Sequence, residues 1–241
     1  MASLKFGFIL PSGDARTTAN LAREAEQAGW DGFFVPEPVW SADAWICLTA
    51  AAMVTERIRL GTMLSPLPRM RPWKLASETA TLDNLSNGRV VLSLAIGWLM
   101  YGYQAFTDEA TDTKKRAELL DEGIDILTLL YAGKQVNYQG KHYHVNLEAL
   151  DPQYYPPSPV QQPRIPLWVV GVWPKMKSMQ RVLKCDGLLP SKMNPDGQFS
   201  PVTPQDVCEM KAYVDQNRSL KTPFDIIAEG KTVGMLSLIH I

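Results

Sequence analysis

Apolar segments of strand-like composition alternate along the chain with segments of helical period. Each predicted strand is a short apolar run rich in β-branched and aromatic residues, and each predicted helix repeats its apolar positions every three or four residues. The predicted strands are 4–10, 32–35, 58–63, 90–96, 167–170, 187–189 and 224–229. The predicted helices are 18–28, 44–55, 72–85, a long segment ending near 131, 175–183 and a segment opened by Thr203. Regular alternation of this kind predicts a parallel sheet covered by helices.

Several boundaries carry local signals. Thr18 is expected to cap the first helix, and Gly29 provides a left-handed stop at its end. Thr203 and Pro204 together are typical of a capped helix whose first position needs no amide donor. The run 90–96 is apolar throughout, as expected of a parallel strand buried on both faces.

Residues from about 135 to 165 interrupt the alternation. Within them, 136–143 predicts a hairpin turning at Gln139–Gly140, followed by a loop rich in proline and tyrosine. We interpret this segment as an insertion in a single domain, 1–235. Seven strands with no G-x-G-x-x-G after any of them favour a barrel over an open dinucleotide-binding sheet. The expected fold is α/β, a TIM (β/α)8-type barrel lacking roughly its last strand and last two helices.

The last six residues, 236–241, are expected to lie outside the native domain. They match, codon for codon in one reading frame, the transposon end sequence used as an adapter in shotgun sequencing libraries. We therefore expect a non-native, adapter-encoded tail, in which contacts of His240 carry no functional meaning. A barrel without its eighth strand would leave the edges of its first and seventh strands unpaired, so the chain as written is expected to be poorly soluble.

Charge and cysteine content limit the kinds of partner. Lys plus Arg total 24 and Asp plus Glu total 25, a net charge of −1 that favours a small-molecule substrate over nucleic acid or a membrane surface. The three cysteines, Cys47, Cys185 and Cys208, are widely separated, which favours a reducing cytoplasm over a disulfide framework. We expect no metal, because His142 and His144 have no third ligand nearby in the sequence.

Four stretches, in this order and spacing, resemble the luciferase-like monooxygenase superfamily. They are 29–35, 55–63, 81–89 and 166–171, and Arg-Pro-Trp-Lys at 71–74 is most similar to bacterial members. The resemblance runs from residue 4 to about 234. It implies an oxidoreductase whose cofactor, reduced FMN or the deazaflavin coenzyme, binds at the carboxyl-terminal mouth of the barrel. Such enzymes either activate dioxygen for monooxygenation or transfer a hydride.

The same resemblance implies cofactor contacts at two neighbouring strand ends. After the third strand the family often holds a non-proline cis peptide against the isoalloxazine ring, and the matching residues are Met63 and Leu64, followed by Ser65. After the fourth strand, Gly97 and Trp98 would let the backbone approach the ring, although a tight turn requires glycine equally.

A phosphate site is implied after the fifth strand, at Gly171, Val172, Trp173 and Lys175. The helix that follows offers free amides and a positive dipole to a phosphate. Val172 and Trp173 stand where the family commonly has Gly-Gly and a hydroxyl residue, which leaves backbone amides as the expected contacts. Replacing Gly171 with a β-branched residue is expected to weaken cofactor binding more than folding.

Glu37 is the expected catalytic residue. Deazaflavin-using relatives often end the second strand with Asp-His, whereas this sequence reads Val-Pro-Glu-Pro at 35–38, and Pro38 cannot replace that His. FMN-dependent members need no His there, which favours FMN and leaves Glu37 as the ionisable group at the mouth. Nearby aromatic residues are expected to wall an apolar pocket. These are Trp40, Trp45, Trp98 and Trp173.

The favoured function is therefore that of a luciferase-like monooxygenase acting on a small organic substrate with reduced FMN and dioxygen, expected to form a homodimer at full length. Three alternatives remain open at this point. They are a deazaflavin-dependent hydride-transfer oxidoreductase, a non-catalytic flavin-binding barrel and an unrelated barrel hydrolase or lyase.

Overall fold

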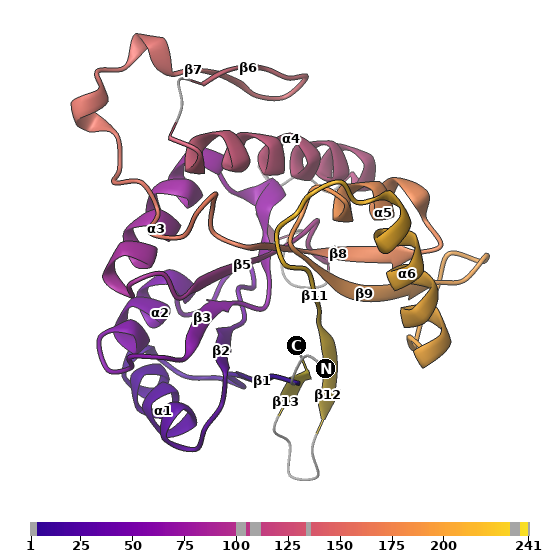
Figure 1. The fold of residues 1–241 in the computed structure, drawn as a ribbon, viewed down its shortest axis with the longest axis horizontal. Helices are drawn as coiled ribbons and strands as arrows, with labels where there is room; N and C mark the ends of the chain where they lie inside the picture. Colours follow the sequence, from indigo (N-terminus) through magenta and orange to yellow (C-terminus); the bar gives the residue numbers. More distant parts are fainter. Residues whose placement is uncertain (1–3, 100–104, 107–111, 134–135, 232–236, 241) are drawn as a thin grey trace.

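A curled parallel sheet forms the centre of the molecule (Figure 1). The computed structural model describes residues 4–99, 105–106, 112–133, 136–231 and 237–240. The parallel strands, in spatial order, are β1 (Phe6–Ile9), β2 (Gly32–Val35), β3 (Arg59–Thr62), β5 (Val90–Ala95), β8 (Leu167–Trp173) and β9 (Gly187–Met193). Their sequence order equals their spatial order, as in a TIM-type α/β barrel.

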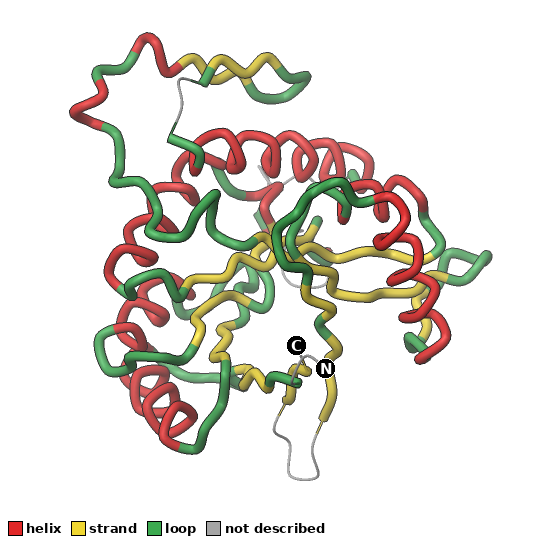
Figure 2. Tube along the Cα trace, in the orientation of Figure 1, coloured by secondary structure: helices red, strands yellow, loops and turns green. Residues whose placement is uncertain are grey.

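Helices cover the outer side of this sheet, whereas the strands form the inner layer (Figure 2). The helices are α1 (Ala15–Gln27), α2 (Ala44–Ala52), α3 (Pro72–Leu85), α4 (Thr113–Tyr131), α5 (Met176–Val182) and α6 (Pro204–Asn217). Helices α1 to α3 lie beside β1 to β5, and α5 and α6 lie beside β8 and β9 (Figure 1). The predicted alternation is therefore confirmed over six strand–helix units.

The last part of the chain joins the two edges of the sheet. Strand β11 (Asp225–Ile226) pairs in parallel with β9, and β12 (Ala228–Lys231) follows after one residue. Strand β13 (Ser237–His240) then runs antiparallel to both β12 and β1. Two expectations are thereby corrected: the predicted strand 224–229 is divided, and the edge of β1 is hydrogen-bonded because 237–240 forms a strand against it.

Two aromatic rings fill the interior of the barrel. The centroids of Phe34 and Trp168 lie 5.6 Å apart, and both side chains are fully buried. Glycines face these rings because no larger residue fits: a Cβ at Gly187 would lie 2.2 Å from Trp168, and one at Gly32 would lie 2.6 Å from Phe34. The barrel interior around these two rings is thus a packed core and not a channel.

Helix starts follow the expected chemistry, with one correction. Thr203 caps α6 in a reciprocal capping box with Asp206, as its position before Pro204 predicts. Helix α1, however, begins at Ala15, and Asp14 is its cap, because the Asp14 side chain accepts the amide of Thr17. The Thr18 hydroxyl donates instead to the Asp14 carbonyl oxygen.

The insertion forms a hairpin that docks on α4, with strands β6 (Asn137–Gln139) and β7 (His144–Asn146). The Glu122 carboxylate on α4 accepts the backbone amides of Lys141, His142 and Tyr143 at 2.9 to 3.2 Å. His142 Nε2 lies 2.7 Å from Glu118, so its partner is a carboxylate on α4. Among the described residues no three His, Cys, Asp or Glu side chains are grouped for a metal ion.

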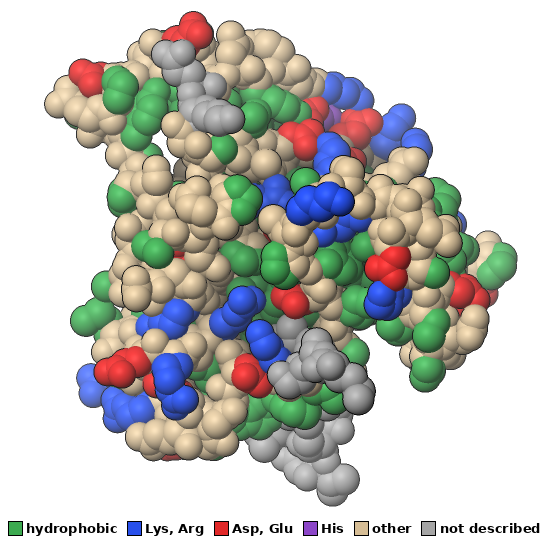
Figure 3. All heavy atoms as spheres, viewed as in Figure 1, with side chains coloured by type: hydrophobic (Ala, Val, Ile, Leu, Met, Phe, Trp, Pro, Cys, Tyr) green, Lys and Arg blue, Asp and Glu red, His purple; other side chains and the backbone are tan. Residues whose placement is uncertain are grey.

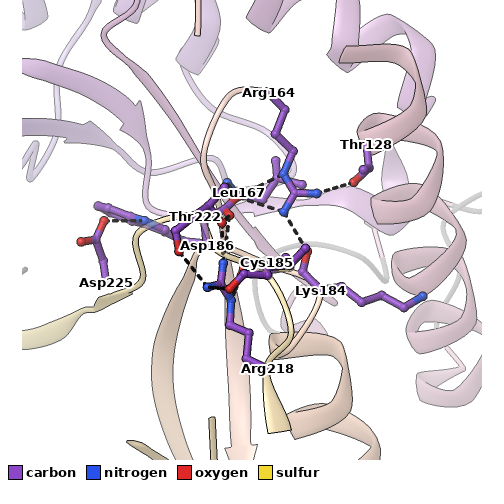
Figure 4. Close-up of polar contacts among 11 residues, drawn as sticks. Thr128, Arg164, Leu167, Lys184, Cys185, Asp186, Arg218, Thr222 and Asp225 are labelled. Atoms are coloured by element: carbon purple, nitrogen blue, oxygen red, sulfur yellow. Dashed lines mark hydrogen bonds and ion pairs between the residues drawn. The ribbon is translucent and has the colours of Figure 1, made fainter. Parts of the chain in front are cut away.

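A buried charge network joins the amino ends of β8 and β9 (Figure 4). Asp186, just before β9, lies between Arg164 and Arg218, at 3.0 Å and 3.2 Å, and all three side chains are less than a tenth exposed. Asp186 also accepts the amide of Leu167 at the start of β8 and the hydroxyl of Thr222. This carboxylate therefore fixes three chain segments with respect to one another.

The outer surface mixes both signs of charge. In Figure 3, acidic and basic side chains lie next to each other near α1 and again near α4 and α5, with apolar side chains between them. In the part of the chain that the structure describes, every helix is too short or too polar to cross a lipid bilayer.

Candidate functional site

The predicted site residues follow the carboxyl ends of adjacent parallel strands. Strands β2, β3, β5 and β8 are neighbours in this order, so the loops after them emerge at one edge of the sheet. That edge is where barrel enzymes carry their active sites. The segments 63–65, 97–98 and 172–175, for which the resemblance implies cofactor contacts, therefore lie at or just after the carboxyl ends of β3, β5 and β8.

Glu37, Ser65 and Thr62 form a hydrogen-bonded chain at this edge. Ser65 Oγ donates to Glu37 Oε2 at 2.5 Å, and Thr62 Oγ1 lies 2.7 Å from Ser65 Oγ. Both hydroxyl side chains are fully buried and Glu37 is partly buried. The two expected residues, Glu37 in the loop after β2 and Ser65 just after β3, are thus in direct contact.

The environment of Glu37 alters its acidity. Burial raises the pKa of the Glu37 carboxyl to about 7, and the Ser65 hydrogen bond and the positive charge of Arg69 act in the opposite direction. Arg69, in the 3-10 turn η1 (Leu67–Arg69), donates to the carbonyl oxygens of Pro38 and Val39 at 3.3 and 2.9 Å. A carboxyl of this pKa exchanges its proton near neutral pH, as an acid–base group requires.

The segment after β3 contains the expected cis bond. The peptide bond between Met63 and Leu64 is cis. Directly after it, the short strand β4 (Ser65–Pro66) pairs with β5, placing Ser65 opposite Leu94 and Pro66 opposite Ala95. Ser65 therefore lies between the Glu37 carboxyl and the end of β5, where the Gly97 turn begins.

The turn after β5 is held from outside the barrel. Gly97 has a φ of +76°, so this position favours glycine for its backbone conformation. Arg116 of α4 donates to the carbonyl oxygens of Gly97 and Ile96 at 2.6 and 3.1 Å. Trp98, the next residue, is 56% exposed. The positive φ thus explains why glycine occupies position 97. A cofactor contact at this turn stays a prediction.

Strand β8 continues three residues beyond its predicted end. Val172 and Trp173 pair with β9, and the Val172 amide donates to Ser178 Oγ at 3.0 Å. The indole of Trp173 donates to Glu209 of α6 at 3.1 Å, so its ring turns toward that helix. Lys175 stands at the N-cap of α5 without a side-chain capping hydrogen bond. The proposed phosphate position near Lys175 stays a prediction.

Gly171 has a packing reason that the sequence did not indicate. It lies on the face of β8 that packs against α5, and a Cβ there would lie 2.4 Å from Leu188, 2.9 Å from Val182 and 3.2 Å from Met179. The side-chain position of Gly171 thus faces the outer core. This packing accounts for glycine at this position without a ligand, and a phosphate contact of the Gly171 backbone stays a prediction.

We therefore expect Gly171→Val to reduce stability and to leave the cofactor affinity of the folded fraction unchanged. Overpacking of a filled core costs about 1–3 kcal/mol, or more where a backbone must move. Denaturant unfolding together with cofactor titration at low temperature would measure both effects. A stable variant with weakened cofactor binding would contradict this prediction.

Aromatic side chains from separate loops surround the same edge. The rings of Trp40 and Phe106 lie 6.4 Å apart, as do those of Trp98 and Phe199. Trp40 is 86% exposed, and the other three rings are 42% to 58% exposed. Trp45, expected beside them, is instead buried in the core between helices and sheet. Exposed aromatic side chains that lie together are a common feature of binding surfaces.

One buried hydroxyl in the barrel interior has no internal partner. Ser93 of β5 shares the interior face with Val91, is fully buried, and its Oγ makes no hydrogen bond to a described residue. A buried polar atom without a partner costs free energy. Ser93 Oγ is therefore available to a polar group of a bound molecule or to an ordered water.

Sequence reasoning missed Thr62, Arg69 and Arg116. Thr62 carries a local signal, since it and Ser65 are hydroxyl residues on either side of the Met63–Leu64 bond. The arginines carry none, because their partners lie 19 to 31 residues away in the sequence.

Comparison with known proteins places this geometry in a family. Residues 5–205 match the family model of the luciferase-like monooxygenases. Uncharacterised proteins of Mycobacterium tuberculosis and Mycobacterium bovis are 30% identical over 191 residues, which cover 69% of this chain. The chain spans 64% of the length of these curated relatives.

Solved structures show the same fold at low sequence identity. A coenzyme F420-dependent tetrahydromethanopterin reductase from Methanopyrus kandleri has a TM-score of 0.72 at 21% identity, covering 93% of this chain and 65% of that one. The oxygenating constituent of 3,6-diketocamphane monooxygenase from Pseudomonas putida, in complex with FMN, has a TM-score of 0.70 at 18% identity, covering 93% and 67%. The sequence match and the fold agree: the chain belongs to the luciferase-like monooxygenase family.

Proposed function

We propose that this protein is a flavin-dependent oxidoreductase that uses reduced FMN and dioxygen to oxidise a small organic substrate. The observation that carries the proposal is the grouping of Glu37, the Met63–Ser65 segment and the Gly97–Trp98 turn at the carboxyl edge of adjacent strands. In this proposal the isoalloxazine ring lies against 63–65 and 97–98, and the phosphate lies near 172–175.

The residues present fit such a group. Among the described residues, Ser93 Oγ is a buried hydroxyl in the interior without a hydrogen-bond partner, and α5 begins without a side-chain cap. Reduced FMN would supply the electrons that activate dioxygen. The protein's own contribution is to orient the cofactor and exclude water, and to hold a proton at Glu37 Oε near neutral pH.

The aromatic side chains at the carboxyl edge of the sheet favour an apolar substrate. Trp40, Phe106, Trp98 and Phe199 offer ring surfaces from three loops. Lys192, near the end of β9, is paired with Asp206 at 2.8 Å. A neutral molecule with an apolar body therefore suits this opening better than a highly charged one.

Anaerobic titration of the purified chain with reduced FMN and, separately, with the deazaflavin coenzyme tests the proposal. We expect saturable binding of FMN at least about tenfold tighter than that of deazaflavin. Trp98→Ala should weaken FMN binding by about tenfold, since loss of one aromatic contact costs roughly 1.4 kcal/mol. Trp73→Ala is the matched control, because Trp73 packs edge-on against Tyr143 of the hairpin.

Each result assigns a different function. Tighter binding of deazaflavin, followed by hydride transfer, would establish the alternative oxidoreductase. Binding of FMN without consumption of dioxygen across a panel of apolar substrates would establish a non-catalytic barrel. Absence of binding to either cofactor would overturn the proposal.

A further inference from the structure

The chain Thr62–Ser65–Glu37 is a buried polar arrangement at the mouth of the barrel. It joins the last residue of β3, the first residue of β4 and the loop after β2, through hydroxyl contacts of 2.7 and 2.5 Å. Thr62 and Ser65 have no exposed surface. Buried hydroxyl groups exchange partners with solvent only at high cost, so their hydrogen bonds depend on one another.

The direction of these bonds follows from proton counting. A serine hydroxyl has one proton, and Ser65 donates it to Glu37 Oε2. The contact with Thr62 is then made by the Thr62 hydroxyl donating to Ser65 Oγ. When the Glu37 carboxyl carries a proton, that proton can be donated to Ser65 Oγ, and Ser65 then donates to Thr62. Only rotation about the C–O bonds is required, and no proton leaves either hydroxyl.

Charged groups from three other elements face Glu37. Arg69 of η1 favours the ionised carboxylate, whereas Asp43 at the start of α2 and Glu78 of α3 oppose it. Burial also opposes the charge, and it is the largest influence. The hydrogen bond from Ser65 is the strongest contribution that favours the carboxylate. The Ser65 hydroxyl is therefore the main group that opposes the effect of burial on the Glu37 carboxyl.

We propose that Thr62 and Ser65 are positioning residues, which hold the Glu37 carboxyl at the mouth of the barrel and reverse their hydrogen bonds when Glu37 binds or releases a proton. This inference rests on the proposed function, in which Glu37 is the acid–base group. It assigns to Ser65 a task beyond contact with a cofactor. It also adds Thr62 to the site.

Infrared titration of the unliganded full chain tests the proposal without cofactor or turnover. The carbonyl band of protonated Glu37 is identified by its absence in Glu37→Gln, and its midpoint is measured against pH. Ser65→Ala should raise the midpoint of this titration by about one to two pH units, because a hydrogen bond to the charged carboxylate is lost. Thr62→Val should raise it by a smaller amount.

Thr62→Val and Thr62→Ser form a matched pair. Thr62→Val replaces the hydroxyl with a methyl group, whereas Thr62→Ser removes the methyl group and keeps the hydroxyl. Thr62→Ser should retain the original midpoint, and so should Ser86→Ala, which removes a buried hydroxyl before β5. If Ser65→Ala does not fold, the Thr62 pair decides alone. An unchanged midpoint in Thr62→Val and in any folded Ser65→Ala protein would overturn the proposal.

The proposed function and this inference fail separately. Absence of FMN binding in the native chain contradicts the function and leaves the infrared midpoints valid. Where the enzyme turns over, kcat/KM can be plotted against pH. The limb of that profile that reports the ionisation of Glu37 should move to higher pH in Ser65→Ala. A lower kcat/KM with an unmoved limb would assign Ser65 a merely structural task and count against the proposal.

Discussion

Asp186→Asn is expected to lower the free energy of unfolding by about 3–5 kcal/mol, because it leaves two buried guanidinium groups without their shared carboxylate. Arg164 Nε and Nη2 both donate to Asp186 Oδ2, and Arg218 Nη2 donates to Oδ1, at 3.0 to 3.2 Å. All three side chains are at most 8% exposed. The melting temperature should fall by on the order of 10 °C.

Asp125→Asn is the matched control for this substitution. Asp125 pairs with Lys184 at 2.7 Å, but the two side chains are 37% and 53% exposed. Exposed pairs of this kind contribute at most about 1 kcal/mol. Thermal and urea unfolding of the two variants would compare the sites, and equal losses would mean that the Asp186 network is not a stabilising centre.

The network also positions the site from the opposite end of the sheet. Figure 4 shows Arg164 reaching Thr128 of α4 and the Lys184 carbonyl oxygen, while Arg218 meets Asp186 and Thr222. These contacts fix where β8 and β9 begin. Because paired strands keep their register along their length, the carboxyl ends of β8 and β9 are fixed as well.

Local chemistry explains what the sequence predicts well. Thr203 before Pro204 is an unambiguous helix start, and the capping box forms there. At α1 the sequence offers two good caps four residues apart, and both Asp14 and Thr18 satisfy the same local rule. The structure uses Asp14, which adds a turn before Thr18. Boundaries of this kind depend on packing, which one sequence does not display.

Features that depend on distant pairing were not predictable. Strand β8 reaches Trp173 because Gly171, Val172 and Trp173 pair with Pro190, Ser191 and Lys192 of β9. That longer strand turns Gly171 outward toward α5. The packing of Gly171 was not predictable because alternation along the strand, whose length depends on β9, decides which residues face the core.

The candidate site was predictable at the level of strand ends and not at the level of contacts. Parallel strands place their carboxyl ends together, so Glu37 and Ser65 could be expected at one mouth although 28 residues separate them. Their hydrogen bond requires the path of the chain through the Met63–Leu64 bond and into β4. No spacing rule contains that information.

Glu37→Gln is expected to reduce kcat by about 10²–10⁴-fold if Glu37 performs acid–base chemistry, with a smaller change in KM. Glutamine keeps the shape of the side chain and can still pair with Ser65, but it cannot exchange a proton. The limb of the rate profile with an apparent pKa near 7 should disappear, since burial raises the pKa of Glu37 to about 7. Glu24→Gln, on the exposed surface of α1, should change neither quantity.

The same substitution should change how stability depends on pH, and the sign is opposite to that of a salt-bridged carboxylate. Because the pKa of Glu37 is higher in the folded chain than its ordinary value of 4.5, protonation favours the folded state. That contribution is complete below the ordinary value and is lost as pH rises through about 7. Glu37→Gln should therefore match the native chain at pH 4 and melt at a higher temperature at pH 8. A difference in melting temperature that does not grow between these pH values would show that the folded chain does not disfavour the ionised carboxylate, and the acid–base assignment would then lose its physical basis.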